Sequence, residues 1–426
     1  MAPANTEERI VWYSIVGTYG FYVLGALYVL APVIAWILFA IAMLRIVRFV
    51  IEGDPKWHVP LPGLVLLWFV GMFVMLISLI VGHFINDFGL GAVIKSTIGW
   101  AKGWALLAVF PLIGCLNIRP QLIYRAACIV SLHTIILTPI FVMAWKLGLP
   151  QVLYVSPVQK VGGPGPEFFA MSLYEIDPSN GSPRWRLFTP WAPALGFVAN
   201  IYFVFALREK SRFYRYAGII GCIIMVLLSG SRLGLLALIT VSAITWWLSM
   251  LGRPFMLWVT GVGTAFTGLI MAPLLGFAEE FATRFREARA DSSRVREALA
   301  RIAVNRWRSE APLWGHGQVE AGPHLVEYMM IGSHHTWYGL LYVKGAVGLV
   351  ALAIPLAASF LFFLIKAIHT AEGRVALSVM LLLFLYTFGE NLEVLAYLIW
   401  PGLLFIGIAS KDILAIKDSD QESKTS

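Results

Sequence analysis

The 426-residue sequence contains only three cysteines and few charged residues, and each scarcity excludes a class of protein. Cys115, Cys128 and Cys222 fall in or beside apolar runs without a pairing pattern or metal-ligand spacing, so a disulfide framework is not expected. Charged residues make up 13% of the chain and hydrophobic residues 59%, and the mean hydropathy is +0.78. These values exclude a soluble globular protein and indicate a polytopic membrane protein.

The amino-terminal sequence also lacks the features of a cleaved signal peptide. MAPANTEERI has two acids beside Arg9, no basic segment ahead of an apolar core and no small-residue cleavage site. We therefore expect the first membrane span to direct insertion. The isoelectric point of about 9.4 is attributed to basic residues in cytoplasmic loops, and no nucleic-acid partner is expected.

Apolar runs long enough to cross a bilayer divide the chain into about twelve predicted spans. A spanning helix needs roughly 20 apolar residues, and the first run, 10–50, is long enough for two spans that separate at Ala31-Pro32. The other ten spans are centred near residues 72, 106, 135, 199, 222, 241, 266, 350, 382 and 401. We predict an all-α polytopic protein with both chain ends on the same side of the membrane.

The distribution of basic residues assigns the loops to the two sides. Short loops rich in Lys and Arg stay cytoplasmic, and every short loop except the turn at Ser229–Arg232 agrees with an amino terminus inside. Two long segments then lie outside together. The predicted organisation is spans 1–5 in 1–146, a first outer loop in 147–190, spans 6–9 in 191–276, a second outer segment in 277–335, spans 10–12 in 336–410 and a cytoplasmic tail in 411–426.

The second outer segment, 277–335, is rich in residue types that act on phosphorylated substrates. Eight arginines fall between Arg284 and Arg308, and four of the chain's eight histidines follow them. Guanidinium groups bind phosphate oxygens in a bidentate manner, and a near-neutral imidazole can take a proton from a hydroxyl. Eight acids bring the formal charge of the segment to zero, so the prediction depends on individual positions and not on a basic patch.

Arginines from three parts of the chain are predicted to meet on the outer face, where they can grip a pyrophosphate. One pair ends the first outer loop, one arginine stands in a turn between spans, and others lie on a predicted amphipathic helix. An amphipathic helix that only binds lipid headgroups, and an arginine that only snorkels to the interface, are the alternatives. The predicted phosphate-binding residues are Arg186, Arg232, Arg289 and Arg296, with Arg184 and Arg294 as secondary candidates.

His334 and His335 stand where the second outer segment re-enters the membrane. Adjacent residues on a helix point about 100° apart, so at most one of the two faces a cleft as a general base; two structural histidines at the interface are the alternative. His316 and Glu390 are secondary candidates, and Glu390 with Glu393 either orients an arginine or forms a solvated turn. The histidine spacing does not match a zinc site, so no catalytic metal is expected.

The order of these motifs resembles that of one family, the O-antigen ligase and O-antigen polymerase superfamily of bacterial envelope glycosyltransferases. RLFTPWAPALGFVAN resembles its arginine-led entry into a mid-chain span, SGSRLGLLAL its Ser-Arg span, and ADSSRVREALARIAVNRWRSEAPLWGHG its arginine helix followed by Pro-Leu-x-Gly-x-Gly. HHTWYGLLYVKGAVGLVAL is similar to its His-Asn-x-x-Leu segment, with Gly345 and Gly348 in register. This register puts the family histidine at His334 and replaces the usual Asn by His335, so the choice between the two histidines stays open.

The resemblance, which covers about residues 180–350, implies a GT-C-like protein of twelve spans in a bacterial inner membrane, with a periplasmic active face. It implies inverting transfer of a glycan from undecaprenyl pyrophosphate to lipid A-core in the ligase branch, or to another carrier-linked repeat in the polymerase branch. Neither metal nor cofactor is implied. The four arginines would hold the pyrophosphate among membrane lipids, and His334 or His335 would take the proton of the acceptor hydroxyl.

Two other classes of protein remain as alternatives. A lipid-linked glycan flippase also binds pyrophosphate with arginines, but alternating access tends to leave internal repeats, and the two halves of this chain show no obvious repeat. A structural partner in an envelope complex would show no turnover in purified form.

Overall fold

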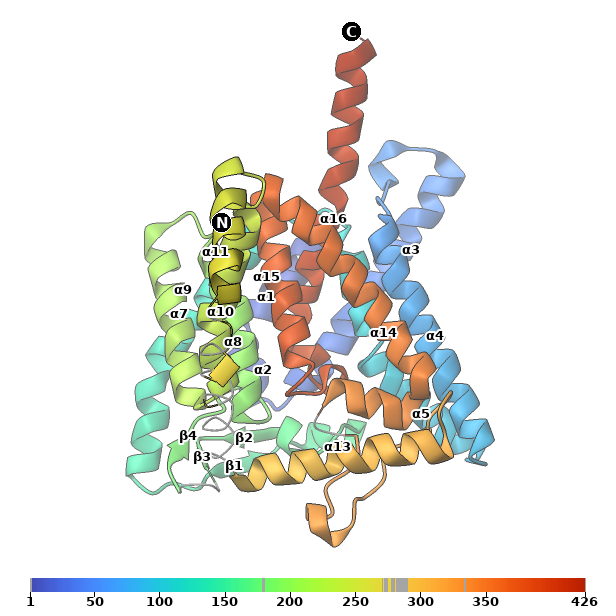
Figure 1. The fold of residues 1–426 in the computed structure, drawn as a ribbon, viewed down its shortest axis with the longest axis vertical. Coiled ribbons are helices and arrows are strands. Elements are labelled where there is room, and N and C mark those ends of the chain that lie inside the picture. Colours follow the sequence, from blue (N-terminus) through green and yellow to red (C-terminus); the bar gives the residue numbers. More distant parts are fainter. Residues whose placement is uncertain are drawn as a thin grey trace.

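Helices form most of the chain and stand side by side in a bundle (Figure 1). The computed structural model describes residues 2–177, 181–269, 290–332 and 335–425, together with 271, 275–276 and 280. The helices are α1 (Thr6–Val16), α2 (Thr18–Val23), α3 (Leu27–Glu52), α4 (Gly63–Ile85), α5 (Leu90–Lys102), α6 (Leu106–Gly114), α7 (Pro120–Lys146), α8 (Ala192–Ala206), α9 (Arg212–Ser229), α10 (Arg232–Met250), α11 (Pro254–Leu269), α13 (Ala290–Glu310), α14 (Thr336–His369), α15 (Ala371–Tyr386) and α16 (Leu392–Thr425).

Eight helical segments among the described residues are long and apolar enough to cross a membrane. They are α3, α4, the α5–α6 pair, α7, α9, α10, α14 and the first part of α16. α8 is a shorter apolar helix. The chain is therefore a multi-pass membrane protein, and each of the ten span centres predicted after the first apolar run lies within a helix. Both chain ends lie toward the upper end of the bundle in Figure 1.

The first apolar run turns at Gly25 and not at the predicted break at Ala31-Pro32. α3 runs through this proline, and the chain bends between α2 and α3 instead. Gly25 has a φ of +63°, and the N–H of Ala26 donates to the carbonyl of Phe21 at 2.9 Å. Together these form a glycine cap that ends α2. The proline is tolerated inside α3 because neighbouring helices pack around a membrane helix and stabilise it.

Buried acids at the upper end of the bundle pair with arginines. Glu8 accepts hydrogen bonds from Nε and Nη2 of Arg119 at 2.7 and 2.6 Å. Glu209 accepts the same pair of bonds from Arg125, at 3.0 and 2.7 Å, and this guanidinium lies 4.1 Å from the ring of Tyr214. Bidentate pairs of this kind add geometric specificity. The first pair joins α1 to the start of α7, and the second joins α7 to the connection that precedes α9.

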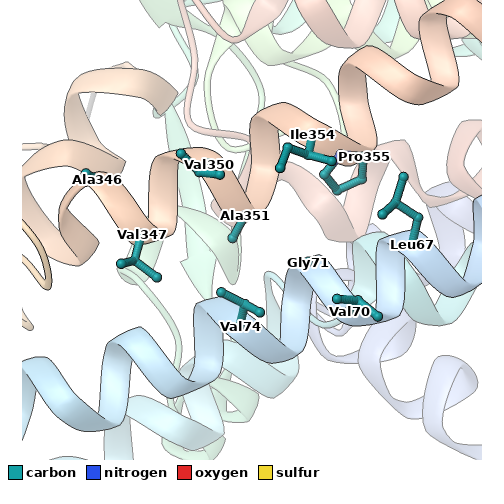
Figure 2. A pocket seen from close by; sticks show the side chains of 10 residues that line it. All are labelled: Leu67, Val70, Gly71, Val74, Ala346, Val347, Val350, Ala351, Ile354 and Pro355. Carbon is teal, nitrogen blue, oxygen red and sulfur yellow. The ribbon is translucent and has the colours of Figure 1, made fainter.

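An apolar groove of about 380 Å³ runs between α4 and α14 (Figure 2). The two helices approach closely because Gly71 has no side chain: a Cβ there would lie 2.4 Å from the carbonyl oxygen of Ala351. The groove is lined by Leu67, Val70, Gly71, Val74, Ala346, Val347, Val350, Ala351, Ile354 and Pro355. None of these residues is polar or titratable, so the groove is no candidate for acid-base or phosphate chemistry.

The lower end of the bundle in Figure 1, opposite to the chain ends, carries the two hairpins and α13. Residues 147–190 contain two antiparallel hairpins, formed by β1 (Val152–Val155) with β2 (Ala170–Ser172) and by β3 (Glu175–Ile176) with β4 (Pro183–Arg184). α13 lies crosswise to the bundle and packs on the first part of α14. Its buried side chains, which recur at helical spacing, are Val295, Ala298, Leu299 and Ala303.

A bend in α14 at Gly345 receives the segment that follows α13. Gly345 has a φ of +61° and a ψ of −164°, so α14 is two helices joined at a kink. The kink leaves the N–H groups of Ala346 and Val347 without helical partners, and they donate to the carbonyls of Pro312 and Leu313 at 3.0 and 3.2 Å. The Pro-Leu-x-Gly-x-Gly and Gly-x-x-Gly motifs therefore pack against each other and set the direction of the first part of α14.

Candidate functional site

The start of α14 is fastened to the turn between α15 and α16. Thr336 donates through its N–H to the carbonyl of Thr387 at 3.1 Å and through Oγ1 to the carbonyl of Glu390 at 2.7 Å. The same Oγ1 accepts from the N–H of Leu392 at 3.1 Å, and the indole of Trp337 donates to Thr387 Oγ1 at 2.8 Å. These bonds hold the backbone that follows His335 against the backbone that carries Glu390.

Glu390 is a buried acid in this turn. Its Oε2 accepts a hydrogen bond from Nε1 of Trp191, 3.0 Å away, and its side chain is only 7% exposed. Burial raises the pKa of Glu390 to about 7, and the charge of Arg296 and the indole hydrogen bond offset part of that rise. Near neutral pH, this carboxyl group is therefore divided between its protonated and ionised forms.

Replacement of Glu390 by glutamine is expected to stabilise the protein at alkaline pH. Because folding raises this pKa from 4.5 to about 7, the associated stability is present below pH 4.5 and is lost as the pH rises through about 7. The full difference corresponds to about 3 kcal/mol. Thermal unfolding in detergent, measured at acidic and alkaline pH, should show this loss in the wild type and not in Glu390→Gln. The exposed Glu327→Gln variant should follow the wild type, and identical curves for all three proteins would contradict the prediction.

His335 precedes α14 and caps it. Its Nδ1 accepts the N–H of Tyr338 at 3.4 Å, and its ring lies 4.2 Å from the ring of Tyr338 and 5.8 Å from that of Phe388. Burial, with a contribution from the charge of Arg296, lowers the pKa of His335 to about 4. The imidazole is therefore neutral at pH 7. Since Nδ1 accepts, the ring proton is on Nε2.

Arg296 lies on α13 opposite these two residues. It is exposed and helps to line a cavity of about 230 Å³, together with Glu297, His335 and Phe388. Its charge acts on both His335 and Glu390. An arginine from α13 and a histidine from α14 thus face one cavity beside the α15–α16 turn.

Arg186 is buried within the same end of the bundle. It precedes α8 and is 6% exposed, and its Nη1 donates to the carbonyl of Pro190. Its Nε has no hydrogen-bond partner among the described residues. The guanidinium acts electrostatically on the hydroxyl groups of Tyr22 and Tyr397. A buried cation with an unused donor is costly, so this group is suited to an anion that enters from outside.

Arg232 begins α10 beside the α15–α16 turn. Ser231 caps the helix by accepting the N–H of Gly234 at 3.1 Å. On its other side, Leu233 lies close enough to Gly389 that a Cβ on this glycine would be 3.1 Å from the leucine side chain. The backbone of Arg232 therefore lies next to the turn that holds Glu390.

The secondary candidates Arg184 and His316 take part in other interactions. Arg184 donates to Glu175 at 2.5 Å and to Asp177 at 3.3 Å, within the second hairpin. His316 stacks on Tyr342, with ring centroids 4.3 Å apart, and its nitrogens bond to the Tyr342 carbonyl at 3.0 Å and to Glu310 at 2.8 Å. These contacts hold the His316 ring against the first part of α14.

The remaining candidates are Arg294, Arg289 and His334. Arg294 is exposed on α13, two residues before Arg296. Arg289 and His334 lie outside the described residues, so their predicted roles stay predictions. The structure thus brings together the segments that carry Arg186, Arg232, Arg296, His335 and Glu390.

Sequence patterns did not identify several residues of this region. Trp191, which holds the Glu390 carboxylate, has no motif that distinguishes it from an interfacial tryptophan. Lys344 is 4% exposed within the membrane-spanning α14, and it interacts electrostatically with Glu393 without a hydrogen bond from its Nζ to any described residue. A lysine inside an apolar run was the available signal, because ionisable residues within spans are usually functional.

Comparisons with protein families and curated proteins identify no relative of this chain. No protein-family model matches the chain, and no curated protein is significantly similar to it. Among the described residues, no group of three or more His, Cys, Asp or Glu side chains is arranged to hold a metal ion. The expected metal-free reaction stays a prediction.

Proposed function

We propose that this protein is a glycosyltransferase that moves a glycan from undecaprenyl pyrophosphate to an acceptor sugar by inverting, metal-independent transfer. The acceptor is lipid A-core, so the reaction is the O-antigen ligation of lipopolysaccharide maturation. In this proposal the chain has twelve spans in a bacterial inner membrane, and the reaction takes place at the periplasmic face.

The main support for this proposal is the convergence of charged groups at one end of the bundle. Arg186 is a buried cation with an unused donor, and Arg296 faces a cavity beside the buried acid Glu390. Positive groups fixed in a water-poor site stabilise the charge that develops on a leaving pyrophosphate. A nearby titratable group can accept the proton that the acceptor hydroxyl loses.

O-antigen polymerisation is the nearest alternative, because it uses the same donor and differs only in the acceptor. The resemblance of the segment that begins at His334 favours the ligase branch modestly. A flippase is the alternative from a different class. It needs charges along a path through the membrane, whereas the candidate arginines within the described ranges gather at one end of the bundle.

Purified protein, incubated with a carrier-linked glycan and lipid A-core in the presence of EDTA, is expected to yield glycosylated lipid A-core. Mass spectrometry of the products made with each acceptor identifies the branch, since a polymerase would extend the carrier-linked glycan instead. Loss of turnover in EDTA would overturn the metal-independent mechanism. Movement of the donor across proteoliposome membranes without any product would favour the flippase.

A further inference from the structure

We propose that Glu390 is the general base that takes the proton from the acceptor hydroxyl, with His335 serving as a hydrogen-bond donor beside it. This inference rests on the proposed glycosyl transfer and names the proton acceptor within that same site. It differs from the sequence-based prediction, which gave this role to one of the two adjacent histidines.

The Glu390 carboxylate is fixed at one oxygen and free at the other. Trp191 donates to Oε2 at 3.0 Å, whereas Oε1 has no hydrogen bond to any residue that the structure describes. The backbone of Glu390 is held in turn by Thr336, whose Oγ1 donates to its carbonyl at 2.7 Å. A base needs this arrangement, because one lone pair must be oriented and still available to a substrate proton.

The charges around Glu390 are suited to a reaction that releases an anion. Arg296, from α13, acts electrostatically on the carboxylate and lines the adjacent cavity of about 230 Å³. Phe388, two residues before Glu390, lines the same cavity, so a pyrophosphate held by Arg296 would lie beside the turn that carries the Glu390 carboxylate. The base, Glu390, and the group that binds the leaving pyrophosphate, Arg296, are then different residues, as inverting transfer requires.

His335 lacks the features of a base in this structure. Its Nδ1 lone pair accepts the N–H of Tyr338, and its Nε2 carries the proton of the neutral ring. The ring can therefore donate a hydrogen bond from Nε2 but has no free lone pair. Burial also keeps the pKa of His335 at about 4, which makes it a weaker base than Glu390 at neutral pH.

The acid–base behaviour of Glu390 agrees with this geometry. Burial raises its pKa to about 7, so an ionised fraction exists at neutral pH and its proton affinity is higher than that of an ordinary carboxylate. The polar and titratable groups that act on its carboxyl come from several elements: Arg296 on α13, Trp191 before α8 and Tyr386 on α15. The segments packed beside this turn also carry Arg232, at the start of α10, and His335, before α14.

The proposed step conserves atoms and electrons. The acceptor oxygen forms a bond to the anomeric carbon of the donor glycan, while the bond from that carbon to the pyrophosphate oxygen breaks. The electron pair of the broken bond leaves with the pyrophosphate, whose negative charge the arginines stabilise. The proton of the acceptor hydroxyl moves to a Glu390 oxygen and is later released to water.

The pH dependence of kcat/KM for glycan transfer tests this assignment. The wild type should lose activity as the pH falls below about 7. Glu390→Gln should lower kcat/KM by about 100-fold or more and should abolish the fall in activity at acidic pH, which is the acidic limb of the pH profile. His335→Ala and His334→Ala should retain this acidic limb. The exposed Glu327→Gln variant, which carries the same chemical change, should behave as the wild type.

Chemical rescue separates a base from a structural acid. In Glu390→Ala, added formate should restore part of the lost transfer rate, because a small carboxylate can enter the vacated space and accept the proton. Thermal unfolding of each variant in detergent shows whether it is folded. An acidic limb that persists in Glu390→Gln, or an absence of formate rescue in folded Glu390→Ala, would overturn the inference and leave the proposed function intact. A wild type that makes no glycosidic product would overturn both.

Discussion

Substitution of Arg186 by alanine is expected to lower the rate of glycan transfer by about 100-fold or more. The basis is the position of this guanidinium: it is buried, it donates to the Pro190 carbonyl, and its Nε has no partner among the described residues. Loss of one fixed donor to a developing anion costs a few kcal/mol of transition-state stabilisation. Arg186→Lys should recover little of the rate, because an ammonium group lacks the planar fork of the guanidinium.

A stability measurement distinguishes this role from a structural one. A buried charge with incomplete pairing destabilises the fold, and its replacement by an apolar side chain of similar volume is often neutral or stabilising. Arg186→Met should therefore unfold at the same temperature as the wild type or higher, although it is inactive. Arg308→Ala, an exposed arginine on α13, should keep both activity and stability. A destabilised Arg186→Met protein with normal turnover would show that Arg186 serves the fold alone.

Substitution of Gly345 by alanine is expected to destabilise the protein by about 4 kcal/mol. The residue has a φ of +61° and a ψ of −164°, a region that essentially only glycine occupies and that costs other residues up to about 3 kcal/mol. An alanine Cβ would also lie 2.2 Å from the carbonyl oxygen of Leu313. The backbone shift that relieves this contact would weaken the bonds of Ala346 and Val347 to the preceding segment, at about 1 kcal/mol each.

Thermal unfolding and detergent-solubilised yield measure this effect, with Gly99→Ala as a matched control. Gly99 lies in α5, and a Cβ there would have no heavy atom within 4 Å apart from its own helix and neighbours. Alanine is the better helix former, so Gly99→Ala should be neutral or slightly stabilising. Equal stability of the Gly345 and Gly99 variants would mean that the kink in α14 is not needed for the fold.

The positions of the helices were largely predictable because a long apolar segment in a bilayer has few alternatives to a helix. The span centres near residues 72, 135 and 241 lie within α4, α7 and α10. The first break was misplaced by hydropathy. Within a continuous apolar run, a proline and a glycine can each mark the end of a helix. The structure places the end at Gly25, because this glycine adopts a left-handed conformation.

The sequence predicted that Arg186, Arg232 and Arg296 share one side of the membrane, and this assignment stays a prediction. The structure places the segments that carry them beside the α15–α16 turn. The environment of Glu390 could not be anticipated, because its hydrogen-bond partner Trp191 is 199 residues away in the chain. The sequence alone also could not show whether a histidine or Glu390 is the better base, because the proton affinity of each group depends on neighbours that are distant in the chain.

By itself, the sequence determined that this is a helical membrane protein with arginines and titratable groups in the segments between its apolar runs, since hydropathy and residue type are local properties of the chain. Only the tertiary structure decided which of those groups are buried, which have unused hydrogen-bonding atoms and which face a common cavity. The physical reason is that a proton affinity or an unsatisfied donor depends on neighbours, and the neighbours of Glu390, Arg186 and His335 come from distant helices.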